Sequence, residues 1–127
     1  MAAEQWAREE HDRIVLQFPF HWYSSPPLLK TWLDDVLEHG WAYGPDGTAL
    51  QGKELALAVS TWSTAADYTA TGRYGRTMSE LTSPYEITAL RTGMHYRPGF
   101  FLNGISHVTD QELTQNAIDY ARWLNEK

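Results

Sequence analysis

The sequence contains no cysteine, which excludes disulfide bonds, thiolate nucleophiles and cysteine-bound metals. Basic residues are also few, because 10 Lys and Arg against 16 Asp and Glu give a net charge of −6. A nucleic acid or an anionic membrane would require a basic patch, so neither is predicted as a partner. The five histidines lack the spacing of metal ligands, and no metal site is predicted.

Long apolar runs are missing as well. No stretch reaches the length of a transmembrane helix, and the segment from Trp6 to His11 is too polar for a signal peptide. We therefore expect no membrane insertion and a cytoplasmic location. The 127 residues are enough for one domain with one core, which we place over residues 1–127.

Apolar runs alternate with helical patterns along the chain. Strands are expected at residues 13–18, 53–61 and 94–103, the last of them broken by Pro98-Gly99; helices are expected at 2–11, 26–40, 76–91 (in two pieces) and from 110 onward. The final helix begins with a capping box at Thr109 and Glu112. Its expected buried face consists of Leu113, Ala117, Tyr120, Ala121 and Leu124. This alternation predicts an α/β fold with a parallel sheet.

The most informative segment is the loop between the first expected strand and the helix that follows it. Residues 17–30 read QFPFHWYSSPPLLK and combine aromatic rings with prolines, which restrict the backbone. In an open α/β sheet, ligands bind at the carboxyl ends of the strands. A rigid aromatic loop at that place suits a flat conjugated ligand such as a flavin ring.

The same residues carry a family resemblance. Residues 17–44 (QFPFHWYSSPPLLKTWLDDVLEHGWAYG), then GKELALAVS at 52–60 and Thr92-Gly93-Met94, resemble the flavodoxin-like NAD(P)H:quinone oxidoreductases, which bind FMN or FAD. The bacterial subgroup that includes general stress protein 14 and the ancillary flavoproteins of potassium efflux is the most similar. The resemblance covers nearly the whole chain. It implies a flavodoxin-like three-layer sandwich, a homodimer, and hydride transfer from NADPH or NADH through the flavin to a quinone.

The resemblance also implies the site residues. The segment that matches the flavin-wrapping loop is Pro19, Phe20, His21, Trp22 and Tyr23, and the second ring-binding segment is Ser60, Thr61, Trp62 and Ser63. Relatives carry two glycines where this chain has Trp62 and Ser63, so Trp62 is expected to crowd or cover one edge of the ring. His21 is interpreted as a partly exposed loop residue without a catalytic role.

Two tyrosines are the predicted catalytic residues. Tyr68 matches a family tyrosine near the flavin O2 atom and the quinone, although a surface tyrosine on a loop is an equally open interpretation. Tyr74 stands where some relatives carry a histidine that assists charge transfer. A phenol at either position can donate a hydrogen bond to developing negative charge.

Part of the family pattern is not found before Ile14. The family sheet has the strand order 2-1-3-4-5, and we expect three of its five strands here, without the first strand or a glycine-rich phosphate loop. Strand 13–18 would then have an unpaired edge, which predicts self-association through that edge or partial disorder. Two alternatives stay open. One is a non-catalytic remnant that does not retain flavin; the other is a regulatory subunit, for which a channel partner is suggested by analogy alone.

Overall fold

The computed structural model describes residues 2–126 and contains a parallel sheet. Its strands are β1 (Arg13–Pro19), β2 (Glu54–Ser60), β3 (His95–Tyr96) and β4 (Phe100–Leu102). β1 pairs with β2 along its whole length, from Arg13 opposite Glu54 to Pro19 opposite Ser60. The other side of β2 pairs first with β3 and then with β4. The expected break at Pro98-Gly99 separates β3 from β4, so the sheet is three strand positions wide.

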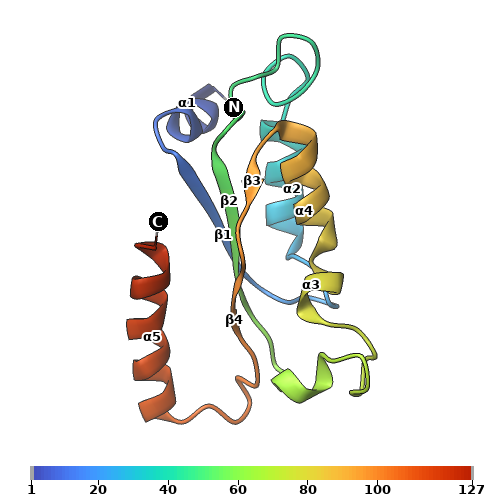
Figure 1. Cartoon of the computed structure of the whole chain (residues 1–127), viewed down its shortest axis with the longest axis vertical. Helices are drawn as coiled ribbons and strands as arrows, with labels where there is room; N and C mark the ends of the chain where they lie inside the picture. Colours follow the sequence, from blue (N-terminus) through green and yellow to red (C-terminus); the bar gives the residue numbers. More distant parts are fainter. Residues whose placement is uncertain (1, 127) are drawn as a thin grey trace.

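The helices lie on both faces of this sheet. They are α1 (Ala2–Glu9), α2 (Pro27–Val36), α3 (Met78–Leu81), α4 (Ser83–Thr92) and α5 (Asp110–Leu124), with a short 3₁₀ turn, η1 (Ala65–Asp67), after β2. Figure 1 shows α2, α3 and α4 along one face and α5 along the other. The predicted α/β class with a parallel sheet is confirmed. No helix within residues 2–126 is long and apolar enough to cross a bilayer.

The core lies between the sheet and helices α2 and α4. β2 is buried over five consecutive residues, 55–59, as expected for a parallel strand covered on both faces. Leu57 at its centre has no exposed surface. β1 alternates instead, with Ile14, Leu16 and Phe18 buried in the core and the residues between them more exposed. The apolar side of α2 packs against this core, because Val36 is fully buried and Leu29, Trp32 and Leu33 contact the buried residues.

Two helix predictions need correction. α2 ends at Val36 rather than near Gly40, because the backbone of Leu37 leaves the helical region with φ −82° and ψ 69°. α5 begins as predicted, and the Thr109 hydroxyl accepts a hydrogen bond from the Glu112 amide at 3.1 Å. The expected burial of its apolar face is wrong, because no α5 residue is buried and Leu113 and Leu124 are 48% and 40% exposed.

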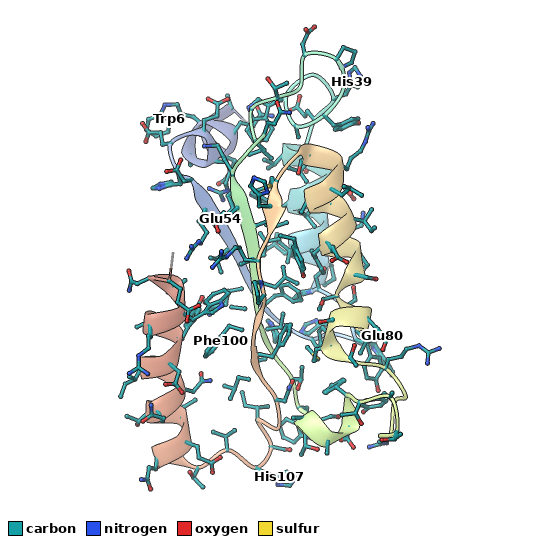
Figure 2. The ribbon with its side chains drawn as sticks, in the orientation of Figure 1. Trp6, His39, Glu54, Glu80, Phe100 and His107 are labelled. Carbon is teal, nitrogen blue, oxygen red and sulfur yellow. The ribbon has the colours of Figure 1, made fainter. Side chains whose placement is uncertain are left out.

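The physical reason is that α5 chiefly contacts one short strand. Phe100 of β4 stacks on Tyr120 and packs against Trp123, with ring centroids 5.2 and 5.6 Å away. Figure 2 shows Phe100 between β4 and α5. Beyond this stack, the Tyr120 hydroxyl reaches Gln17 of β1 at 2.6 Å. A three-position sheet offers α5 too little surface to cover the rest of its apolar side.

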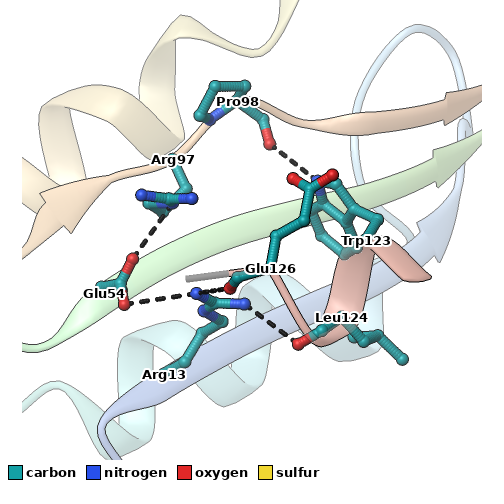
Figure 3. A network of polar contacts seen from close by, with 7 residues as sticks. All are labelled: Arg13, Glu54, Arg97, Pro98, Trp123, Leu124 and Glu126. Carbon is teal, nitrogen blue, oxygen red and sulfur yellow. Dashed lines mark hydrogen bonds and ion pairs between the residues drawn. The ribbon is translucent and has the colours of Figure 1, made fainter. Parts of the chain in front are cut away.

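The carboxyl end of α5 is tied to the sheet by an arginine (Figure 3). Arg13 of β1 donates hydrogen bonds to the carbonyls of Leu124, at 3.0 Å, and of Glu126. The same guanidinium contacts the Glu54 carboxylate at 3.4 Å, and Arg97 contacts the other oxygen of that carboxylate at 3.1 Å. One side chain therefore connects the first strand, the central strand and the last helix.

The outer edge of β1 has no strand partner among residues 2–126. A groove of about 540 Å³ runs along it, bordered by β1 itself, by Arg8 of α1, and by Leu28 and Trp32 of α2. Leu28 is 81% exposed at this border. The predicted open edge is thus present in the described part of the chain.

Candidate functional site

The loop after β1 folds into a tight turn that places aromatic residues in an unusual backbone conformation. His21 and Ser24 exchange two backbone hydrogen bonds, at 2.8 and 3.0 Å. The residues between them, Trp22 and Tyr23, have φ values of +48° and +63°. Two positive φ angles define a type I′ turn, which favours glycine or asparagine. Bulky residues there carry strain of order 1–3 kcal/mol each, which is characteristic of functional sites.

This strain predicts a stabilising substitution. Trp22 is 92% exposed, so its side chain contributes little packing. Trp22→Gly should raise the free energy of unfolding by about 0.5–1 kcal/mol, measured by urea denaturation. Trp22→Phe is the matched control, because it keeps a bulky residue at φ +48° and should leave stability within about 0.5 kcal/mol. Equal stabilities of the two variants would contradict the strain.

The turn also leaves backbone donors available. Within residues 2–126, the amides of Trp22, Tyr23, Trp62 and Ser63 donate to no protein acceptor. Amides of the flanking residues are used, since Phe20 donates to the Ser60 carbonyl at 2.9 Å. The site therefore presents two pairs of free N–H groups at the carboxyl ends of β1 and β2.

The second segment is held against the last strand. Thr61 donates its amide to the Leu102 carbonyl at 2.9 Å, and its buried hydroxyl lies 2.8 Å from the Ser63 carbonyl and from the Asn103 side chain. Its side chain is therefore structural. The Trp62 indole is 73% exposed. Asn103 was not predicted, although its place at the end of strand 94–103 was a signal that could have found it.

Four aromatic rings converge beside these segments. Phe20 meets Tyr68 edge-on at 6.1 Å, Tyr68 lies 5.2 Å from Tyr74, and Tyr74 lies 5.0 Å from Tyr23. The Tyr74 hydroxyl is 2.9 Å from the Ser63 hydroxyl. Tyr68 is only 6% exposed, so the alternative interpretation of a surface tyrosine is wrong. We call Phe20, Tyr23, Ser63, Tyr68 and Tyr74 the aromatic cluster.

The structure brings together some of the predicted site residues and not others. The side chains of the aromatic cluster are in mutual contact. Pro19 and Ser60 lie opposite each other in the register of β1 and β2. His21, Trp22 and Trp62 are exposed and their side chains are not part of the cluster. Among residues 2–126, no group of three His, Asp or Glu side chains gathers as metal ligands would.

The hydrogen bonds of the cluster change the acidity of two phenols. The pKa of Tyr74 is lowered, first by the hydrogen bond from Ser63 and then by that from Tyr23. The pKa of Tyr23 is raised, chiefly because it donates to Tyr74 and secondly because of partial burial. The cluster therefore makes one of its phenols the better proton donor.

This fold is that of a known family. The chain belongs to the family described as having a flavodoxin-like fold, whose model matches residues 1–124. A curated relative, the uncharacterized NAD(P)H oxidoreductase YrkL of Bacillus subtilis, is 48% identical over 94% of this chain and 70% of its own length.

Solved structures give the same family. General stress protein 14 of Treponema denticola, in complex with FMN, is 48% identical with a TM-score of 0.93 and matches 98% of this chain and 71% of its own. An NADPH-quinone reductase from P. pentosaceus is 33% identical with a TM-score of 0.93 and matches 99% and 74%. A protein described as a thermophilic tryptophan halogenase from Streptomycin violaceusniger is 44% identical with a TM-score of 0.97 and matches 99% and 73%.

Proposed function

We propose that this chain binds FMN at the aromatic cluster and works as an NAD(P)H:quinone oxidoreductase. The observation that carries the proposal is the strained turn at Trp22 and Tyr23. The turn has no evident stabilising role in the fold, and it presents free amides beside the cluster. FMN is proposed rather than FAD because the FMN-bound general stress protein 14 matches nearly the whole chain.

The residues present fit a flavin ring. The free amides of Trp22, Tyr23, Trp62 and Ser63 suit the hydrogen-bond acceptors on the polar edge of isoalloxazine. Phe20 and Tyr68 supply an apolar wall for its face. When bound, flavin supplies hydride chemistry between NADPH or NADH and a quinone. The chain's own part is to bind and orient the ring, and to offer the hydroxyls of Tyr68 and Tyr74 to an oxygen that becomes negative.

The proposal includes a homodimer that completes each site. The exposed indoles of Trp22 and Trp62 support it, since tryptophan is enriched in protein interfaces and each residue is next in the chain to a residue of the cluster. A quinone would then lie against the ring in a cleft that excludes water. The name of the halogenase relative does not change the proposal, because one fold hosts many activities and the named oxidoreductases and the quinone reductase agree with one another.

The ring and the phosphate of FMN can be tested separately. Residues 2–126 offer free amides for the ring, but they contain no glycine-rich loop at a helix N-terminus for a phosphate. Lumiflavin, which is the ring alone, should therefore bind within about threefold of FMN, a difference below roughly 1 kcal/mol. The measurement is quenching of flavin fluorescence during titration with protein.

Phe20→Ala supplies the site variant for that titration. This variant should bind both FMN and lumiflavin more weakly by a similar factor. The expected loss of affinity is about tenfold, because an aromatic contact of some 1.4 kcal/mol is removed. The exposed Ile87→Ala, on α4, is the control and should change neither affinity. Absence of binding by both flavins would contradict the proposal and would favour the remnant that does not retain flavin. Menadione-dependent oxidation of NADPH by the flavin-loaded protein then tests the reaction.

A further inference from the structure

Three residues of the aromatic cluster that carry hydroxyl groups meet in a way that no sequence pattern indicates. Tyr23 comes from the turn after β1, Ser63 follows β2, and Tyr74 lies in the long loop before α3. The hydroxyls of Ser63 and Tyr74 are 2.9 Å apart, and the Tyr23 ring packs edge-on against the Tyr74 ring with centroids 5.0 Å apart. Tyr74 is therefore the middle member, with the Ser63 hydroxyl on one side and the Tyr23 ring on the other.

The contact with Ser63 can leave the Tyr74 proton available. A phenol oxygen has two acceptor sites and one proton to donate. When Ser63 donates to the Tyr74 oxygen, the Tyr74 O–H has no protein acceptor among residues 2–126. The same donor would stabilise the phenolate that remains after the proton has left.

The loop that carries Tyr74 is held in place by its backbone. The Tyr74 amide donates to the Asp67 carbonyl at 3.1 Å, and the Gly72 amide donates to the Thr69 carbonyl at 3.1 Å. A side chain at Gly72 would meet the Ala66 carbonyl oxygen at 2.2 Å, so the close approach requires glycine there. These contacts fix the position from which the Tyr74 side chain reaches Ser63.

Two charged groups face Tyr74 in addition to the hydroxyls. The Arg73 guanidinium lies 5.4 Å from the centre of the Tyr74 ring and favours the phenolate. Asp67 acts in the opposite direction, and Tyr68 packs against the ring without a hydrogen bond to it. The hydroxyl donors are the larger influence, and together with Arg73 they make the Tyr74 phenol more acidic than an isolated one.

We propose that Ser63 and Tyr23 are positioning residues that hold the Tyr74 hydroxyl as the proton donor of this site. The inference rests on the proposed function for its reaction. A quinone that accepts one hydride, which brings two electrons and one proton, needs a second proton to become the hydroquinone. Tyr74 gives that proton to the quinone oxygen by breaking its O–H bond, and water returns a proton to the phenolate.

The first test needs neither flavin nor turnover. In protein with ¹³C-labelled tyrosine ζ carbons, an NMR titration follows each of the seven phenols separately. The Tyr74 resonance, identified by its loss in Tyr74→Phe, should titrate below the other tyrosines. Ser63→Ala should raise its midpoint by about half to one pH unit, since one pKa unit corresponds to a tenfold change in the equilibrium. Tyr23→Phe should raise it in the same direction.

The matched control is Ser79→Ala, which removes an exposed serine hydroxyl outside the cluster and should leave the Tyr74 midpoint unchanged. A Tyr74 phenol that titrates with the other tyrosines, or that does not respond to Ser63→Ala or Tyr23→Phe, overturns the inference. If one of these two variants does not fold, the other still decides the result.

Turnover of the flavin-loaded protein gives the second readout. The donor must be protonated, so kcat should fall as pH rises through the pKa of Tyr74, and in Ser63→Ala that fall should move to higher pH with the NMR midpoint. Tyr74→Phe should lower kcat by about 10²-fold and abolish this alkaline limb. An unchanged kcat in Tyr74→Phe overturns the inference, whereas the expected NMR result without any flavin binding instead contradicts the proposed function.

Discussion

Leu57→Ala is expected to lower the free energy of unfolding by about 2–5 kcal/mol. Leu57 has no exposed surface and lies at the centre of β2, which pairs on both sides and separates the two helical layers. Its removal leaves a cavity that a parallel strand fixed by two neighbours cannot close. Because small domains have total stabilities of about 5–15 kcal/mol, the variant should lose a large part of its free energy of unfolding.

The chain offers a matched control for this substitution. Leu113→Ala makes the same chemical change on α5, where the side chain is 48% exposed and no residue of the helix is buried. Its effect should stay within about 0.5 kcal/mol. Urea denaturation followed by far-UV circular dichroism measures both variants. Similar losses for the two leucines would mean that α5 is packed as tightly as β2, contrary to the structure.

The second large effect concerns the unpaired edge of β1. Its backbone N–H and C=O groups on one side have no strand partner among residues 2–126, and the apolar groove beside it is about 540 Å³. Such edges pair with other chains unless charge or proline blocks them. We therefore expect a chain of these 127 residues to self-associate, with a molar mass by light scattering that rises with concentration.

Val15→Lys should reverse that association. Val15 is only half-buried and lies outside the core, so a lysine there places charge on the edge without removing core packing. The dissociation constant of the associated form should rise at least about tenfold, equivalent to 1.4 kcal/mol. Thr48→Lys adds the same charge on an exposed loop and should change nothing. A monomeric wild-type protein at all concentrations would show that the edge is protected in another way.

Much of the fold could be predicted from local sequence signals. The apolar runs at 13–18 and 53–61 predict strands, and Pro98-Gly99 predicts the break between β3 and β4. These signals work because proline, glycine and hydrophobic period act over a few residues. The run at 13–18 was interpreted as a strand covered on both faces, and that interpretation is wrong because burial alternates along β1. The burial of α5 could not be predicted in the same way, because a helical apolar face shows what a helix could cover and not what lies opposite it.

The candidate site also has features that the sequence predicts and features that it does not. The loop at 19–23 was identified by its residue types, but not the strained turn within it, because tryptophan and tyrosine give no turn signal. Tyr68 and Tyr74 were chosen from a family pattern. The contacts of Tyr74 with Ser63 and Tyr23 join residues 11 and 51 positions apart in the chain, and no spacing rule indicates such contacts.

Because few contacts hold α5 on the sheet, this helix should unfold locally before the rest of the structure. With no buried residue of its own, α5 is held by the stack on Phe100 and by the two carbonyls that Arg13 binds. Amide hydrogen exchange should accordingly be fastest in α5, through detachment of this helix alone, and slowest in β2, where exchange needs global unfolding. The last helix is thus a detachable unit, and a protease would cleave there while the sheet and the aromatic cluster stay folded.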